Sequence, residues 1–355
     1  MTRAPLRVGL LGYGLAGRVF HAPLIAATPG LRLDAVVTRD PGRREQVRAD
    51  HPDARLLADA DELWRAAETV DLVVVATPNR QHVPLARAAI RAGLPVVVDK
   101  PLAPTSAEGR ALVGEAAAAG VPLTVFQNRR WDGDFLTVRR LVEEGRLGRV
   151  HRFESRFERW RPAIKPGWRE SGAVGEAGGA LFDLGAHLID QALRLFGPAE
   201  RVYAEVDRRR PGVEVDDDAF VALTHTGGVR SHLWMSAVAA QTGPRLRVLG
   251  DRAAYVVDEL DVQEALLRAG HRPDDPSWSR VDPSAYGRLG ADGEAPTVPT
   301  ENGRYQEFYA RVAAALTGGG PMPVDPADAV EVVALIELAH EAAARGVTLP
   351  VPPTR

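Results

Sequence analysis

Cysteine is absent from this sequence of 355 residues, and lysine occurs only at Lys100 and Lys165 among 44 basic residues. The lack of cysteine excludes disulfides, iron–sulfur clusters, thiolate zinc sites and a cysteine nucleophile, and it fits a reducing, cytoplasmic location. The two lysines are informative because arginine cannot replace lysine where a compact or titratable ammonium is needed. The alternative is that both are accidental survivors of a general drift from lysine to arginine.

Long apolar runs and a strong net charge are also missing. The formal net charge is −3 with both signs interspersed, whereas nucleic-acid binding needs a positive face. No stretch reaches the roughly 18 apolar residues of a membrane-spanning helix, and the short run Val8–Leu11 does not resemble a signal peptide. We therefore expect a cytoplasmic protein of about two domains with no nucleic-acid or membrane partner.

Residues 1–125 alternate apolar runs with helical patterns, which is typical of parallel strands covered on both faces. The sequence predicts an α/β Rossmann domain with a parallel sheet in this region. The expected strands are Leu6–Leu11, Leu31–Thr38, Asp71–Ala76, Leu94–Val98 and Leu123–Phe126, and the expected helices are Ala16–Ala27 (interrupted by Pro23), Asp59–Glu68, Val83–Ala92 and Ser106–Ala119.

Residues 126–355 show a different pattern, in which strands follow one another with a hairpin turn at Thr226–Val229. We expect an α+β C-terminal domain with a large, mostly antiparallel sheet for substrate binding and oligomerisation. The expected helices are Phe135–Glu144, Ala180–Phe196, 302–316 and 326–344, the terminal pair being placed to pack across both domains. The expected strands are Val150–Trp160, Ala199–Val206, Ala219–Thr226, Val229–Val238 and Arg245–Val257, and 270–300 reads as a long loop.

A glycine pattern, Gly12-x-Gly14-x-x-Gly17, follows the first strand and opens the next helix. In a dinucleotide-binding loop the first glycine makes the turn, the second admits the pyrophosphate and the third lets the helix pack on the strand. This context predicts cofactor binding by the loop, which also contains Tyr13, Leu15 and Ala16. The alternative is a chance glycine-rich turn.

The end of the second strand should contact the adenosine ribose. Thr38 occupies the position where an NAD site has an acid, and Arg39 follows it. A hydroxyl and a guanidinium suit a 2′-phosphate, so we predict a preference for NADP(H) over NAD(H), with help from Arg43 and Arg44. The alternative is that the arginines are solvated and that Asp40 allows NAD to bind.

Two later strand ends should line the same cofactor site, because ligands bind at the carboxyl ends of parallel strands. Thr77, Pro78, Asn79 and His82 follow one buried strand, although His82 has an alternative role in packing. Asp99, Lys100 and Pro101 follow the next strand, where a lysine can stabilise a developing alkoxide.

A second candidate cluster lies on the expected helix Ala180–Phe196. Asp183 and His187 are four residues apart and share a helical face, and a histidine beside a carboxylate suits a general base. Gly185 costs about 1 kcal/mol relative to alanine there, which indicates a close approach. The alternative is a capping aspartate and a core histidine.

Together these motifs resemble the Gfo/Idh/MocA oxidoreductase family over essentially the whole chain, with Asp99 where the family usually has glutamate. Residues 12–23, residues 127–135 and the segment Lys165–Glu170 further resemble the subgroup that contains NADP-dependent scyllo-inositol dehydrogenases. The resemblance implies hydride transfer between nicotinamide and a secondary alcohol or ketone of a cyclitol or sugar. It assigns catalytic roles to Lys100, Asp183 and His187, requires no metal, and implies a homodimer or homotetramer.

Several assignments stay open at this stage. Substrate contacts are expected from Asn128, Arg129, Trp131, Lys165, Trp168 and Arg169, although interdomain or subunit contacts are an alternative. A sheet face carrying Phe153, Val221, Leu233 or Trp234 is a candidate for pairing with a second subunit. The alternative functions are a dehydrogenase of another sugar or aldose, an NAD-dependent glycoside hydrolase, and a non-enzymatic NADP sensor.

Overall fold

The computed structural model describes residues 4–164, 167, 170 and 172–353, and the chain divides into two compact units. Unit 1 comprises Met1–Asn128, Gln263–Ser279 and Arg304–Val330, and unit 2 comprises Arg129–Val262, Arg280–Gly303 and Glu331–Arg355. In the described part of the chain, no helix is long and apolar enough to cross a membrane.

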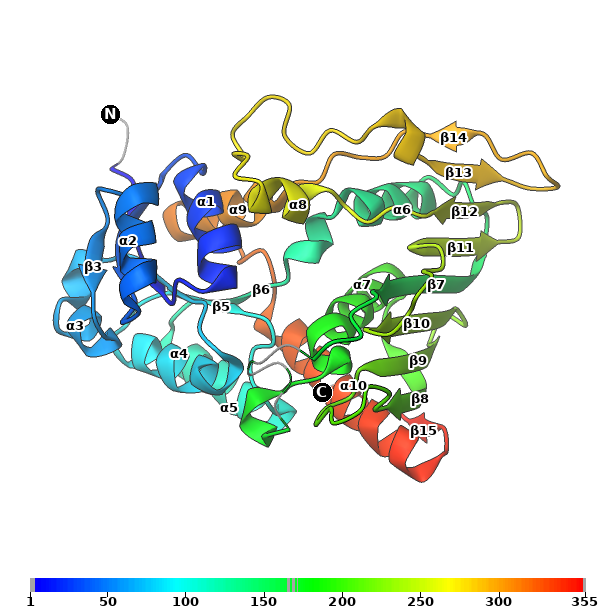
Figure 1. The fold of residues 1–355 in the computed structure, drawn as a ribbon, viewed down its shortest axis with the longest axis horizontal. Coiled ribbons are helices and arrows are strands. Elements are labelled where there is room, and N and C mark those ends of the chain that lie inside the picture. The colour runs from blue at the N-terminus through cyan, green and yellow to red at the C-terminus, as the bar shows by residue number, and fades with distance from the viewer. Residues whose placement is uncertain (1–3, 165–166, 168–169, 171, 354–355) are drawn as a thin grey trace. The chain divides into compact units, whose positions relative to one another are not determined.

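Unit 1 contains a six-stranded sheet, within the described residues, in the order β3-β2-β1-β4-β5-β6. All neighbouring strands pair in parallel, and the order reverses between β1 and β4, which confirms the predicted Rossmann fold. Figure 1 draws this sheet in blue and cyan. The strands are β1 (Leu6–Leu11), β2 (Leu31–Val37), β3 (Arg55–Leu57), β4 (Leu72–Val75), β5 (Val96–Asp99) and β6 (Leu123–Phe126).

The start and the end of helix α5 (Ser106–Ala119) follow local sequence signals. Helix α5 coincides with its predicted bounds, since the Thr105 hydroxyl accepts from the Glu108 N–H at its start and Gly120 has φ +65° at its end. The other helices of this unit are α1 (Ala22–Ala26), α2 (Pro41–Asp50), α3 (Ala60–Arg65), α4 (His82–Arg91), α8 (Gln263–Arg268) and α9 (Tyr305–Gly318), with α5 at Ser106–Ala119.

Pro23 does not interrupt the first helical segment, contrary to the sequence-based expectation. A π-helical turn, Ala16–His21, leads directly into α1, and Pro23 lies in the first turn of α1, where a missing N–H costs little. The expectation also omitted helix α2 and strand β3.

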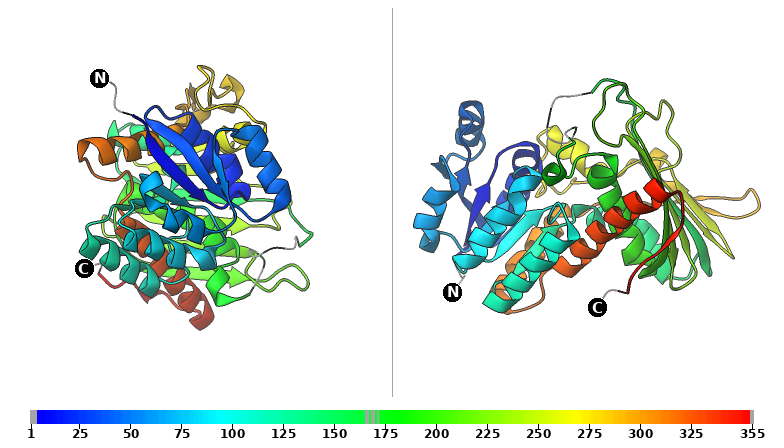
Figure 2. Two further views of the ribbon diagram at one scale, coloured as in Figure 1. Left: turned by 90° about the vertical axis from the view of Figure 1, so that its left-hand side faces the viewer. Right: turned by 90° about the horizontal axis from the view of Figure 1, so that it is seen from below.

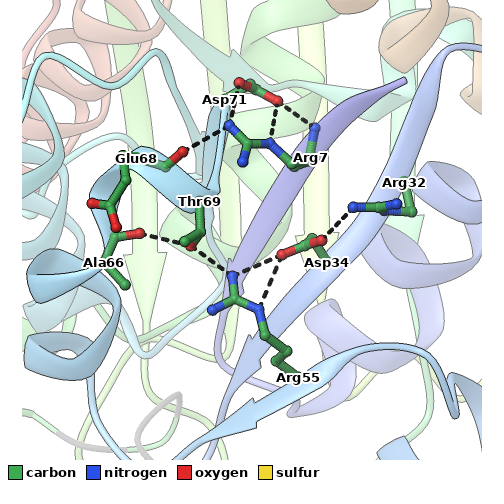
Figure 3. A network of polar contacts seen from close by, with 8 residues as sticks. All are labelled: Arg7, Arg32, Asp34, Arg55, Ala66, Glu68, Thr69 and Asp71. Atoms are coloured by element: carbon green, nitrogen blue, oxygen red, sulfur yellow. Dashed lines mark hydrogen bonds and ion pairs between the residues drawn. The ribbon is translucent and has the colours of Figure 1, made fainter. Parts of the chain in front are cut away.

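Arginine–carboxylate pairs join neighbouring strands near their amino ends (Figure 3). The Arg7 guanidinium donates to both carboxylate oxygens of Asp71 at 3.0 Å, and Arg55 donates to Asp34 at 2.7 Å and to the Thr69 hydroxyl. Burial alone would raise the pKa of Asp34, but hydrogen bonds from Arg55 and Arg32 outweigh it and hold that pKa below its usual range. These pairs lie at the opposite end of the strands from the glycine loop.

Unit 2 contains a nine-stranded sheet, within the described residues, in the order β14-β13-β12-β11-β7-β10-β9-β8-β15. Only β7 and β10 pair in parallel among these neighbours, which confirms a mostly antiparallel sheet. The strands of this sheet lie at the right of the right-hand view in Figure 2. The strands are β7 (Val150–Glu158), β8 (Ala199–Asp207), β9 (Asp218–His225), β10 (Arg230–Ser236), β11 (Leu246–Gly250), β12 (Ala254–Val257), β13 (Gly287–Gly290), β14 (Thr297–Val298) and β15 (Leu349–Pro350). The run Arg245–Val257 is thus a hairpin, and 270–300 contains two strands rather than a loop alone.

Helices cover one face of this sheet, and no helix of the described residues covers the other. Helix α7 (Ala186–Phe196) packs on the same face as Phe153, Val221 and Leu233, which are buried in one hydrophobic core. Residues 332–342 of helix α10 (Pro326–Arg345) join that core, and α6 (Gly133–Glu143) supplies Val138 and Leu141. Three of the four residues expected on a subunit-pairing face are therefore interior. Only Trp234 is on the outer face, with Tyr203, Phe220 and His232.

Candidate functional site

The three glycines of the loop after β1 have distinct structural roles. Gly12 has φ +97°, and a Cβ there would lie 2.7 Å from the Ala76 carbonyl oxygen, so only glycine fits the turn. A Cβ at Gly17 would lie 2.1 Å from the Gly12 carbonyl oxygen. A Cβ at Gly14 would meet only Arg43 Nη1, at 4.0 Å, among the described atoms. The backbone is thus closely packed at Gly12 and Gly17, whereas the space beside Gly14 is open. A pyrophosphate bound to the loop requires this arrangement.

The residues between these glycines fix the loop on one side. Tyr13 is 1% exposed, and its hydroxyl donates to Asp50 Oδ2 at 3.1 Å while its ring edge contacts His51. Burial raises the Tyr13 pKa, so the phenol keeps its proton. Leu15 is 42% exposed, and Ala16 begins the π-helical turn. Tyr13 therefore anchors the loop to the end of α2.

The end of β2 presents arginines to the same loop. Thr38 is buried, whereas Arg39 is largely exposed and pairs with Asp59 at 3.7 Å. Asp40 caps α2, since its Oδ1 accepts the Arg43 N–H at 2.8 Å, and Arg44 donates to the Thr38 and Leu57 carbonyls. Of the arginines after Thr38, Arg43 is the one whose guanidinium lies near Gly14.

The loops after β4 and β5 are joined by His82. Its Nδ1 lies 2.7 Å from the Pro101 carbonyl oxygen and its Nε2 lies 2.9 Å from the Thr77 carbonyl oxygen. Burial lowers the His82 pKa, so the neutral ring has one N–H and donates to one carbonyl at a time. The Thr77 hydroxyl is buried with no hydrogen-bond partner among the described residues, which leaves a polar group for a ligand. Pro78 is half-buried and Asn79 is buried.

Asp99 holds the backbone at Lys100. Its Oδ1 accepts the Lys100 N–H at 2.8 Å, and its Oδ2 lies 3.9 Å from His21 Nε2. Burial raises the pKa of Asp99, but His21, His82 and Lys100 outweigh that effect and hold the pKa below its usual range. An aspartate at this position therefore hydrogen-bonds the backbone of Lys100. The side chain of Lys100 is half-buried.

The helix that carries Asp183 and His187 begins with a π-helical turn, Leu181–Gly185, and continues as α7. The Leu181 N–H donates to Asp216 Oδ2 at 2.7 Å, so Asp216, from another segment of the chain, caps the start of this helix. A Cβ at Gly185 would lie 2.7 Å from Leu181 Cδ1 and 3.0 Å from Met235 Cε. The close approach inferred at Gly185 is thus made by core side chains. His187 is 6% exposed and Asp183 is half-buried.

The expected substrate residues divide into two groups. Asn128, Arg129 and Trp131 are each about 5–6% exposed, and Arg129 donates to Asp132 at 3.2 Å and lies over the Phe157 ring. Lys165, Trp168 and Arg169 lie outside the described residues. Sequence reasoning missed Arg210, Asp216 and Asp217, for which the only signal was an unexplained run of three acids, Asp216–Asp218.

Comparisons with known proteins cover both units. A family model described as "Oxidoreductase family, NAD-binding Rossmann fold" matches residues 6–127, and one described as the GFO/IDH/MocA C-terminal domain matches residues 135–256. The chain is 36% identical to the scyllo-inositol 2-dehydrogenase (NADP(+)) IolW of Bacillus subtilis, over 95% of this chain and 93% of that protein. It is 40% identical to the uncharacterized oxidoreductase YdgJ of Escherichia coli, over 97% and 98%. A solved structure of the Bacillus subtilis oxidoreductase yvaA aligns with a TM-score of 0.93 at 34% identity, over 99% of this chain and 100% of that one.

Proposed function

This chain belongs to the Gfo/Idh/MocA oxidoreductase family and is an NAD(P)-dependent dehydrogenase acting on CH–OH donors, and on that premise we propose that it uses NADP(H) and a cyclitol or sugar. The proposed reaction interconverts a secondary alcohol and a ketone, and scyllo-inositol is the first substrate to test. The similarity to a relative named as an NADP(+)-dependent scyllo-inositol 2-dehydrogenase supports this choice.

The placement of Arg43 carries the cofactor preference. Its guanidinium lies 4.0 Å from the Cβ position of Gly14, and Arg43 stands in the first turn of the helix that follows Thr38. Thr38 occupies the end of β2, and Asp40 is engaged as the cap of α2. A hydroxyl and a guanidinium at these positions favour a 2′-phosphate over a free 2′-hydroxyl.

Three side chains of this chain are assigned to the chemistry. The bound dinucleotide supplies hydride acceptance and donation at its nicotinamide ring. In the proposed oxidation His187 takes the hydroxyl proton, Lys100 hydrogen-bonds the same oxygen, and Asp183 positions the substrate or His187. In reduction the proton movements reverse. Asp99 keeps the backbone of Lys100 in place through the 2.8 Å hydrogen bond to the Lys100 N–H.

A spectrophotometric screen tests the proposal. NADP+ and NAD+ are each supplied with inositol isomers and aldoses, and NADPH with inososes, while absorbance of the reduced nicotinamide is followed. Turnover of a cyclitol with NADP+ supports the proposal, and a strong preference for NAD+ contradicts the interpretation of Thr38, Arg39 and Arg43. Release of free sugar from a glycoside without net NADPH change favours the glycoside hydrolase, and binding of NADP(H) with no turnover favours the sensor.

Two substitutions test the assigned roles. In Lys100→Ala and in His187→Ala, kcat should fall by about 10²–10⁴-fold because each variant loses a group that contacts the reacting oxygen. NADPH binding, measured by fluorescence, should persist in both. Full turnover in both variants would contradict the assignment.

We also propose self-association through the outer face of the nine-stranded sheet. The ring centroids of Phe220 and Trp234 lie 5.1 Å apart there, and the guanidinium carbon of Arg156 lies 4.0 Å from the centroid of the Trp234 ring. An aromatic face without a covering helix within the described unit suits a homodimer or homotetramer. Mass photometry measures the state directly, and a monomer at micromolar concentration contradicts the proposal. The cytoplasmic location stays a prediction, which cell fractionation tests.

A further inference from the structure

We infer that the connection between β8 and β9, residues 208–217, contains three positioning residues. Asp216 holds the start of the helix that carries Asp183 and His187, and Arg210 and Asp217 hold the chain that precedes this helix. The inference rests on the proposed function, since it gives these residues a purpose in proton and hydride transfer. None of the three belongs to the cofactor motifs or to the assigned catalytic set.

Asp216 fixes the first turn of that helix. The first N–H groups of a helix have no partner within it, and here the Ala180 N–H donates to the Asp216 carbonyl at 2.8 Å and the Leu181 N–H to Asp216 Oδ2 at 2.7 Å. Asp216 is 7% exposed, and burial raises the pKa of its carboxyl. Two consecutive N–H groups are thus tied to one residue of another segment.

Gly179 is matched to this contact. It has φ +100°, and a Cβ there would lie 2.1 Å from Asp216 Oδ1. Only glycine lets the chain pass the carboxylate at this distance while the next two residues turn into the helix. The start of the helix is therefore defined by Gly179 and Asp216 together.

Asp217 is bound to a different set of groups from Asp216. Its Oδ1 accepts the Arg209 N–H at 2.7 Å, and its Oδ2 accepts the Arg210 N–H at 3.0 Å and Arg210 Nε at 2.8 Å. Burial raises the pKa of Asp217, but these hydrogen bonds outweigh it and hold the pKa below its usual range. Asp217 therefore fixes both the backbone and the guanidinium of Arg210.

Arg210 extends this network to the chain that precedes the helix. Its Nη2 donates to Glu170 Oε2 at 2.8 Å, and its Nη1 lies 3.4 Å and 3.5 Å from the carbonyl oxygens of Arg161 and Ala163. The side chain of Arg210 is only 5% exposed, and it has a buried carboxylate, Asp217, on one side and the partly exposed carboxylate of Glu170 on the other. A planar fork with five donors is needed to serve two carboxylates and two carbonyls at once, which lysine cannot do.

Glu214 adds one more contact, as its Oε2 accepts the Gly172 N–H at 3.0 Å. The connection therefore contacts residues 161, 163, 170, 172, 180 and 181, in chain order, and ends at the helix that carries Asp183 and His187. A misplacement of about 1 Å at a reacting group costs as much as 10²-fold in rate, so a change in this connection should reach the chemistry.

The first experiment compares Arg210→Lys with Arg209→Lys. Both keep the positive charge, but Arg209 is exposed and pairs with Asp207 and Asp218 rather than with the preceding chain. We expect kcat/KM for the alcohol to fall about ten- to a hundredfold in Arg210→Lys and to stay within about twofold in Arg209→Lys. NADPH affinity should be unchanged in both.

The second experiment is a conservative series at Asp216. Asn caps a helix about as well as Asp, so Asp216→Asn should retain most activity, whereas Asp216→Ala should lose about tenfold or more in kcat/KM. Wild-type kcat/KM in both Arg210→Lys and Asp216→Ala, with folding confirmed by circular dichroism, overturns the inference.

Hydrogen exchange separates this inference from the proposed function. If the wild-type chain turns over no alcohol in the screen, the proposed function fails on its own. Amide exchange at Ala180, Leu181 and the turns up to His187 should still accelerate in Asp216→Ala and stay unchanged in Asp216→Asn. Equal exchange in the wild type and Asp216→Ala overturns the inference, whatever the enzyme assay gives.

Discussion

The Nδ1 atom of His21 lies 2.6 Å from the hydroxyl of Tyr309, although 288 residues separate them in the chain. Both side chains are fully buried, and burial together with the nearby Asp99 raises the pKa of Tyr309, so the phenol keeps its proton in this hydrogen bond. His21 then has its Nε2 on the side of Asp99, at 3.9 Å. Asp99, which hydrogen-bonds the backbone of Lys100, is therefore followed by a buried chain of contacts through His21 to Tyr309.

Removal of this hydroxyl should destabilise the protein. Tyr309→Phe leaves a buried ring nitrogen without its partner, which costs about 1–3 kcal/mol in the free energy of unfolding. Urea denaturation measures the difference. Tyr203→Phe is the matched control, since the Tyr203 hydroxyl bonds to Glu205 at an exposed position and its loss should leave the transition unchanged. Equal midpoints for both variants would show that the His21–Tyr309 contact contributes nothing.

Cofactor preference should depend on Arg43. In Arg43→Ala the KM for NADP+ should rise about tenfold or more, because a charge-assisted hydrogen bond to a phosphate contributes about 1.5–3 kcal/mol, and the KM for NAD+ should change little. Arg48→Ala is the control, as Arg48 is exposed on the same helix. If the KM values for NADP+ and NAD+ rise by the same factor, or if Arg48→Ala has the same effect as Arg43→Ala, Arg43 does not bind the 2′-phosphate.

Two helical glycines should respond in opposite directions to alanine. Gly185→Ala places a Cβ 2.7 Å from Leu181 Cδ1, so we expect a net loss of about 1–3 kcal/mol in the free energy of unfolding. Gly114 in α5 has no described atom within 4 Å of its Cβ position, and Gly114→Ala should gain about 0.5–1 kcal/mol from helix propensity. Thermal and urea unfolding check both, and stabilisation by Gly185→Ala would contradict the packing.

The pair Arg55–Asp34 should give a pH-dependent stability that is separate from activity (Figure 3). Because the pKa of Asp34 is lowered in the folded protein, its contribution is present above the unfolded value of about 3.9 and is lost as the pH falls through the lowered folded value. Asp34→Asn should reduce the free energy of unfolding by about 1 kcal/mol at pH 7. That difference should shrink below about pH 4, while kcat stays unchanged at pH 7. If the difference in the free energy of unfolding between the wild type and Asp34→Asn grows as the pH falls, the pKa of Asp34 is not lowered in the folded protein.

Local signals were sufficient for much of unit 1. The strand runs around Val73 and Val97 and the cap and end of α5 were predicted from the sequence because each signal lies within the element itself. Helix α2 was missed because it has only one buried residue, Val47, although Asp40 and Pro41 gave a usable start signal.

Other features depend on partners that are distant in the chain. Strands β13 and β14 are short, and they are defined by the pairing of β13 with β12 and of β14 with β13 rather than by an apolar run. Leu233 and Trp234 are consecutive residues of β10, so their side chains point to opposite faces of the sheet. Which of the two faces is the inner one depends on where the covering helix packs. The helix that carries Asp183 and His187 is capped by Asp216, which is 35 residues away from Leu181 in the chain, so no local pattern predicts this cap.

The unit that carries the glycine loop is not a single stretch of chain, and this limits how it can be exchanged or shortened. A fragment ending at Asn128 would lack residues 304–330 and hence α9. Phe126 would lose its contacts with Phe308 and Tyr309, whose ring centroids lie 5.0 Å and 6.0 Å away, and His21 would lose its hydrogen bond. A nucleotide-binding module cut from this protein for fusion or grafting therefore has to include α9, joined back to β6 by a designed linker.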